Sequence, residues 1–142
     1  MNHIQKYTPS QLLPVIQTLK STYLQWFGFY ANIPKIHRYT LGSRIDSMLI
    51  ETIETSVTAG FLKGVEKIPY IRLAIRKLDT LKVLLSVLYE TKSLDDKKYI
   101  ALSISLAEAG RMLGGWYGQL TKSSGAGLCS AQQNSPAKAG EK

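Results

Sequence analysis

The lysine and arginine residues of this chain are its clearest candidates for a binding function. Lysine and arginine number 18 against 10 aspartate and glutamate residues, giving a formal net charge of +8 and a pI near 9.6. Such an excess favours a polyanionic partner, because each phosphate contact releases condensed counterions. A merely basic protein without such a partner is the alternative. The candidate nucleic-acid-binding residues are Lys35, His37, Arg38, Arg72, Arg76, Lys77, Lys82, Lys97 and Lys98.

The spacing of these cations predicts one basic end and one basic flank on a helical protein. Residues 35–38 form a basic turn, and residues 97–98 open a later helix at the same end. Arg72 and Arg76 stand one helical turn apart. We expect this surface to bind phosphate with little reading of base sequence. Alternatively, each residue is a solvated cation or part of a weak surface pair, such as Arg76 with Asp79.

Two other arginines, Arg44 and Arg111, fall close to the apolar stripes of their helices. An ion pair with Asp46 or Glu108 therefore competes with a ligand-binding role. For these two arginines we favour the structural role.

Catalytic and metal-binding chemistry finds few suitable residues. The two histidines are His3 and His37, and no Glu-x-x-His pair is present to build a carboxylate metal site in a helix bundle. No glycine-rich loop precedes a lysine to cradle phosphates. His37 stands among basic residues, where a solvent- or phosphate-facing role is favoured over that of a general base. We expect no catalytic residue, no metal, no cofactor and no enzymatic activity.

The apolar and cysteine content indicates the compartment. No apolar run approaches the roughly 20 residues that a membrane-spanning helix needs, and residues 1–14 do not resemble a secretory signal. The single cysteine, Cys129, cannot form an internal disulfide, which is typical of a reducing compartment. We therefore expect a cytoplasmic protein.

Apolar residues recur at steps of three and four, which predicts four amphipathic helices. Prolines and glycine bound them at about 14–32, 38–63 and 69–92, and a fourth begins after Ser93 and ends near Lys122. Ser93 and Asp96 resemble a capping box for this last helix. Similar lengths and short turns imply an all-α, up-down-up-down antiparallel bundle over residues 1–122. Residues 123–142 are polar and small, which predicts a disordered tail.

Apolar residues also lie off the main stripes, which predicts contacts between subunits. A wide core stripe is the alternative. These residues are Ile50, Leu73, Leu84, Val87, Ile100 and Ile104.

Glycines within the helices predict close approaches of another backbone, because each costs about 1 kcal/mol of helix propensity. Gly42 lies one turn into the second helix. Gly110, Gly114 and Gly118 line one side of the fourth. We expect tight packing there, either within the bundle or between subunits.

Three segments together resemble a known family. They read LPVIQ at 13–17, PKIHRYTLGSRI at 34–45 and EAGRMLGGW at 108–116, with Tyr23 and Trp26 between the first two. In order and spacing they are similar to the accessory variability determinant (Avd) proteins of diversity-generating retroelements. They are equally similar to the related four-helix proteins encoded in intervening sequences of ribosomal RNA genes.

The resemblance implies a four-helix protomer that assembles into a basic, barrel-like homopentamer. It implies association with the reverse transcriptase of the same element and with RNA, and by extension DNA or an RNA–DNA hybrid, in support of mutagenic cDNA synthesis. The polymerase chemistry would belong to the partner. Lys35 and Arg38 occupy matching positions that would face phosphate. The alternative is an oligomeric interaction scaffold of the ribosomal intervening-sequence type, without a polymerase partner.

Overall fold

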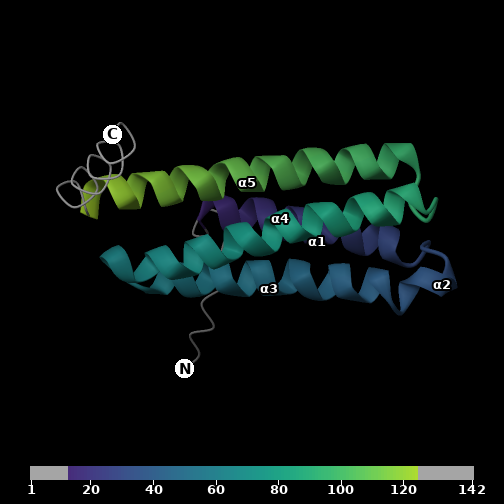
Figure 1. The fold of residues 1–142 in the computed structure, drawn as a ribbon, viewed down its shortest axis with the longest axis horizontal. Helices are drawn as coiled ribbons and strands as arrows, with labels where there is room; N and C mark the ends of the chain where they lie inside the picture. The colour runs from purple at the N-terminus through teal and green to yellow at the C-terminus, as the bar shows by residue number, and fades with distance from the viewer. Residues whose placement is uncertain (1–12, 125–142) are drawn as a thin grey trace, which may run out of the picture.

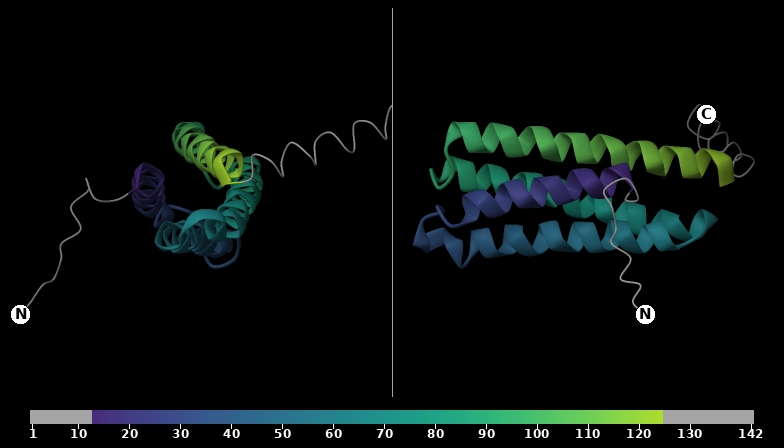
Figure 2. Two further views of the ribbon diagram at one scale, coloured as in Figure 1. Left: turned by 90° about the vertical axis from the view of Figure 1, so that its left-hand side faces the viewer. Right: turned by 180° about the vertical axis from the view of Figure 1, so that it is seen from behind.

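The protein is a bundle of four long helices in the computed structural model, which describes residues 13–124 (Figure 1). The elements are α1 (Pro14–Tyr30), α2 (Lys35–Arg38), α3 (Leu41–Phe61), η2 (Gly64–Lys67), α4 (Ile68–Glu90) and α5 (Asp96–Ser124). Successive long helices run in opposite directions, and each packs against two others, with α5 closing the ring against α1 (Figure 2). The predicted all-α antiparallel bundle is confirmed for one protomer.

The core lies along the bundle axis and is almost entirely aliphatic. Leu19, Ile45, Ile71, Leu81 and Leu113 are each fully buried. The polar residues buried with them are hydroxyls, Thr22, Thr52 and Ser56. Each of these hydroxyls donates to the carbonyl four residues earlier in its own helix, so none is available as a polar centre between helices.

Helix starts at prolines follow the prediction. Pro14 lies in the first turn of α1, and Pro69 lies in the first turn of α4, where a missing backbone N–H costs nothing. The second long helix, predicted at about 38–63, begins three residues later than expected, and the basic turn before it is itself helical. Pro34 begins the separate short helix α2, in which the N–H groups of His37 and Arg38 both donate to the Pro34 carbonyl at 2.9 Å. The backbone leaves helical geometry at Thr40, and α3 begins at Leu41.

Gly42 lies where α3 passes close to the turn before it. A Cβ atom there would stand 3.0 Å from the His37 carbonyl oxygen and 3.2 Å from Cε1 of Tyr30. The predicted close approach at Gly42 is therefore confirmed, and it holds α2 against the start of α3.

The predicted capping box at Ser93 is wrong. α4 ends with Lys92 in the left-handed region at φ 67°, and the Ser93 N–H donates to the Leu88 carbonyl at 3.1 Å. Those are the features of a Schellman motif, so Ser93 terminates α4 and cannot begin α5. Asp95 caps α5 in its place, since its Oδ1 accepts the Lys98 N–H at 2.9 Å.

The last helix extends two residues beyond its predicted end, to Ser124. The rest of the predicted tail, with Cys129, and the N-terminal His3 lie outside the described residues. No helix among residues 13–124 is both long enough and apolar enough to cross a membrane.

Candidate nucleic-acid interface

The candidate basic residues divide between opposite parts of the bundle. Residues 35–38 and 97–98 lie at the end that contains α2, on the right in Figure 1. Arg72 and Arg76 lie on the first half of α4, towards the other end. A rise of about 1.5 Å per residue separates Arg72 from Glu90, at the α2 end, by about 27 Å. Lys77 and Lys82 lie between the two groups on α4, and each is paired with an acidic residue. The unpaired cations therefore do not form one continuous end-and-flank surface.

At the α2 end, two of the candidates make contacts that hold the turn. His37 Nδ1 lies 2.7 Å from Ser93 Oγ, which joins α2 to the α4–α5 turn. Arg38 donates from Nη2 to the Ala31 carbonyl at 3.0 Å and from Nε to the Ile33 carbonyl at 3.1 Å. Its guanidinium thus satisfies carbonyls beyond the end of α1.

Exposed cations at the α2 end alternate with acidic residues. Lys35 and Lys97 are exposed and make no ion pair with any residue of 13–124. Lys98 pairs with Asp95 at 3.7 Å and stands 5.6 Å from the ring centre of Phe29. Because residues 90, 95 and 96 are also acidic, the charge at this end is mixed.

A groove of about 820 Å³ lies beside the α4–α5 turn, with Lys92, Lys97 and Asp96 among its lining residues. Tyr89 also lines this groove. Its ring stacks on that of Tyr99 with 4.2 Å between the ring centres, and its hydroxyl donates to Asp96 at 2.7 Å. That hydrogen bond raises the pKa of the Tyr89 phenol. The groove brings both signs of charge together and is not selective for an anion.

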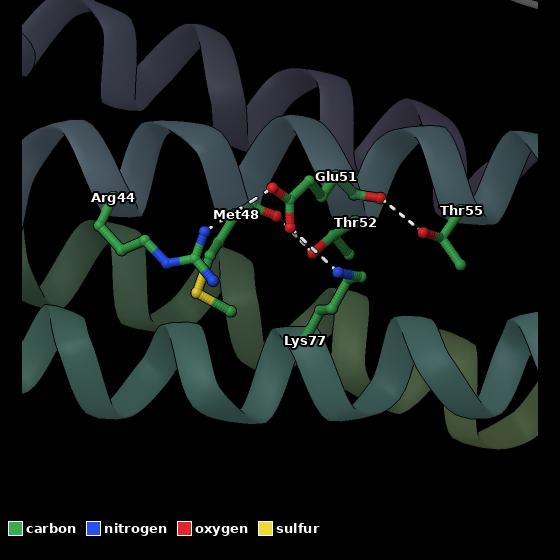
Figure 3. A network of polar contacts seen from close by, with 6 residues as sticks. All are labelled: Arg44, Met48, Glu51, Thr52, Thr55 and Lys77. Carbon is green, nitrogen blue, oxygen red and sulfur yellow. Dashed lines mark hydrogen bonds and ion pairs between the residues drawn. The ribbon is translucent and has the colours of Figure 1, made fainter.

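Lys77 belongs to an ion-pair network between α3 and α4 (Figure 3). Its Nζ donates to Glu51 Oε1 at 3.0 Å, and Arg44 lies 3.7 Å from the other carboxylate oxygen. The hydrogen bond from Lys77, with the nearby charges of Lys77 and Arg44, holds the pKa of the Glu51 carboxyl below its usual value against the opposing effect of burial. Lys77 is therefore already neutralised by a partner within the protomer.

The two stripe arginines have structural partners. Arg111 pairs with Glu108, as expected. Arg44 pairs with Glu51, and the expected pair with Asp46 is wrong. Asp46 is occupied elsewhere, because its Oδ1 accepts hydrogen bonds from Tyr23 at 2.9 Å and from Trp26 Nε1 at 3.1 Å. Partial burial and that hydrogen bond raise the pKa of Tyr23.

Of the cations on α4, Arg76 has the fewest polar contacts with other side chains of residues 13–124. Its alternative pairing with Asp79 does not form, since Asp79 lies 3.8 Å from Lys82. Arg76 is exposed and makes no ion pair or side-chain hydrogen bond within residues 13–124. One turn earlier, Arg72 Nη2 donates to the Tyr117 hydroxyl at 3.2 Å, with the guanidinium 5.7 Å from the ring centre.

Lys67 joins this region, although sequence reasoning did not select it. Its Nζ donates to the Ala59 carbonyl at 3.0 Å, at the end of α3, and lies 5.8 Å from the ring centre of Trp116. A lysine just after a helix end is a weak signal for such a cap. Its contact with Trp116 depends on tertiary packing, which periodicity does not report.

The end of the bundle opposite α2 is thus strongly positive. We call it the cationic end. Across segments 61–72 and 114–124 the single acidic residue is Glu66. The cationic end comprises Lys63, Lys67, Arg72 and Lys122, with Arg76 one turn away on α4.

A groove of about 420 Å³ opens at the cationic end, between the start of α1 and the last turns of α5. We call it the Trp116 groove. Its wall is mostly apolar, with one amide at the rim. The lining includes Leu13, Pro14, Met112, Gly115, Trp116 and Gln119.

The glycines of α5 differ in what surrounds them. A Cβ at Gly110 would lie 3.1 Å from Lys82 Nζ and 3.4 Å from Leu78, so the predicted close packing within the bundle holds there. At Gly114 and Gly118, apart from the chain neighbours and the adjacent α5 backbone, no atom of residues 13–124 lies within 4 Å of the same position. The predicted packing within the bundle is therefore wrong at these two glycines, and their surface is open in the protomer.

The described part of the chain, residues 13–124, holds no cluster of three or more His, Cys, Asp or Glu residues placed to bind a metal ion. Every buried side-chain nitrogen or oxygen in that part has a hydrogen-bond partner.

The comparisons with known proteins agree with the resemblance carried by the three sequence segments. A comparison with curated proteins found no match. The family model described as bAvd-like matches residues 15–120, which span α1 to nearly the end of α5. The chain therefore belongs to the bAvd-like family and is an Avd-type protein.

Proposed function

We propose that this protein is the nonenzymatic accessory subunit of a diversity-generating retroelement. In this role it associates with the reverse transcriptase of the element and with its RNA, and it supports mutagenic cDNA synthesis. The observation that carries the proposal is the family match over residues 15–120. The protomer contributes a charged, rigid surface, and the polymerase contributes the chemistry.

The cationic end supports binding of nucleic acid. The segments that form it contain several lysines and arginines but a single acidic residue. The local electrostatic field therefore favours binding of a phosphate backbone. At the α2 end, Lys35 and Lys97 remain exposed and unpaired within the described residues, and they are the candidates there. Three other candidates already make hydrogen bonds or ion pairs within the protomer through their side chains: His37, Arg38 and Lys77.

The exposed apolar residues support assembly into a homo-oligomer, which the family resemblance gives as a pentamer. Of the off-stripe residues, Leu84 packs partly against the core, and the other five are exposed. The largest exposures among them are 66% for Ile104 and 56% for Ile100. On α1, Leu24 and Phe27 are also exposed, at 59% and 62%.

These apolar residues lie at a common height along the bundle. Leu24 and Phe27 on α1 and Ile100 and Ile104 on α5 all fall within about 12 Å of the α2 end. Contact surfaces at one height suit a head-to-tail contact that closes into a ring, because a height offset between the two contacting surfaces would generate a helical filament.

Co-purification tests the proposal. The protein should be tagged and co-expressed with the reverse transcriptase encoded beside it, with the cell's RNA left undigested. We expect the polymerase and its RNA to be retained, and light scattering of the accessory protein alone to give five times the protomer mass. An oligomer that retains neither the polymerase nor RNA, from a gene enclosed in a ribosomal RNA gene, would instead support the scaffold alternative.

A further inference from the structure

We propose that the Trp116 groove binds an unstacked base of single-stranded nucleic acid. The inference rests on the proposed nucleic-acid-binding function and names the form of nucleic acid that the cationic end recognises. A duplex keeps its bases stacked inside, whereas a single strand can present one base to an aromatic wall.

The chemistry of the groove suits a nucleobase. Its volume of about 420 Å³ falls within the range of roughly 300–1,000 Å³ typical of small-molecule sites. Trp116 supplies an aromatic wall, and Gln119 supplies an exposed amide that can both donate to and accept from the edge of a base.

Gly115 makes the groove accessible. Apart from its chain neighbours and the adjacent α5 backbone, no atom of residues 13–124 lies within 4 Å of the position that a Cβ would take at Gly115. A planar ligand can therefore approach the α5 backbone beside Trp116. A side chain at this position would extend from the wall of the groove, and its Cβ would meet no other element of the protomer.

Charge selects the occupant. An apolar groove alone would accept a peptide equally well, but this one lies among lysines and arginines. Lys67 Nζ stands 5.8 Å from the Trp116 ring centre, and Lys63, Arg72 and Lys122 belong to the same end. A ligand that joins a flat apolar group to a phosphate fits both features, and a nucleotide strand repeats that combination along its length.

The full-length protein allows a direct test with octauridylate as the single-stranded probe and a short RNA duplex as the comparison. The chain has two tryptophans. Trp26 is fully buried, with its Nε1 bonded to Asp46, so a change in emission on adding RNA reports on Trp116. We expect octauridylate to change the tryptophan emission, and the duplex to leave it unchanged.

Glycine substitutions provide a matched pair of variants. Gly115→Leu fills the groove, whereas Gly114→Leu adds the same side chain at the preceding open position of α5, outside the groove lining. We expect Gly115→Leu to weaken octauridylate binding about tenfold, the loss of roughly one stacked base. The slope of affinity against salt should stay unchanged, because the phosphate contacts remain. Gly114→Leu should bind as the wild type does.

Three results would overturn the inference. They are equal octauridylate affinity in the wild type and Gly115→Leu, saturation without a change in tryptophan emission, and a changed oligomeric mass in Gly115→Leu. The last would assign the groove to contact between copies of the chain. In the first two cases the wild type would still bind RNA, so the proposed function would survive. Failure of the wild type to bind any polynucleotide at low salt would count against the proposed function itself.

Discussion

His37 Nδ1 and Ser93 Oγ, 2.7 Å apart, connect the two turns at one end of the bundle. One residue belongs to α2, between the first two long helices, and the other terminates α4. Because they are 56 positions apart in sequence, this contact links segments that would otherwise separate as the turns fray.

A double-mutant cycle measures that link. We expect His37→Ala and Ser93→Ala each to lower the free energy of unfolding by about 1 kcal/mol, the usual net value of a hydrogen bond. The double variant should lose less than the sum of the two, and urea denaturation gives all of these values. Strict additivity would mean that the two side chains stabilise the turns independently.

Substitution of two adjacent residues on α4, Arg76 and Lys77, distinguishes a phosphate contact from a structural ion pair. Arg76 is exposed and unpaired within the described residues, whereas Lys77 is bonded to Glu51. We expect Arg76→Ala to weaken RNA binding and to reduce the slope of log affinity against log salt by about 0.7–0.9. Lys77→Ala removes the same formal charge and should leave that slope unchanged. RNA affinity should be measured by fluorescence anisotropy over a salt series. An equal loss of affinity in both variants would mean that RNA binding depends on the overall charge of the protein and not on a contact made by Arg76.

Acid should remove the contribution of the Glu51 carboxylate to stability. The folded protein holds the pKa of Glu51 below its ordinary value of 4.5, so the folded state binds fewer protons than the unfolded state in that pH range. The contribution is therefore present above pH 4.5 and is lost as the pH falls through the folded value.

Comparison with Glu51→Gln tests this pH dependence. We expect the wild type to exceed the variant in free energy of unfolding at neutral pH by no more than about 1 kcal/mol, since the pair is partly exposed. The difference should shrink on acidification below pH 4.5. A difference that grows towards acid would contradict the ion pair as its source.

A charge introduced among the exposed apolar residues of α5 should prevent assembly of the oligomer. We expect Ile104→Glu to lower the oligomeric mass measured by light scattering, because burying the carboxylate between subunits costs several kcal/mol. Val65→Glu is the control, since Val65 is also exposed, at 56%, but lies at the cationic end. Its mass should match that of the wild type. Dissociation by Val65→Glu alone would move the subunit contact to the other end.

The sequence predicted the long helices well because their boundaries depend on local chemistry. Pro14 and Pro69 fix helix starts wherever they occur, and the period of the apolar residues reports which side of each helix is buried. The short helix α2 was not predicted, because none of its four residues is buried and apolar periodicity therefore does not report it.

The candidate site was less predictable, because a basic residue carries no local sign of its partner. Arg76 and Lys77 are adjacent in sequence, and only the position of Glu51 on the facing helix distinguishes them. Ser93 has the residue type of a helix cap, but the left-handed turn at Lys92 assigns it to the helix before. Lys67 and Trp116 meet only once α3, η2 and α5 have packed together.

The separation of the cationic end from α2 gives the protomer a polar axis. In a cyclic assembly every copy points the same way, so the proposed ring would have two dissimilar rims. One rim would repeat the cationic end and its groove once per subunit. The other rim would repeat the α2 end, where positive and negative charges are mixed. A long RNA engaging several copies on the positive rim would gain avidity from individually weak contacts and would be held on one side of the ring.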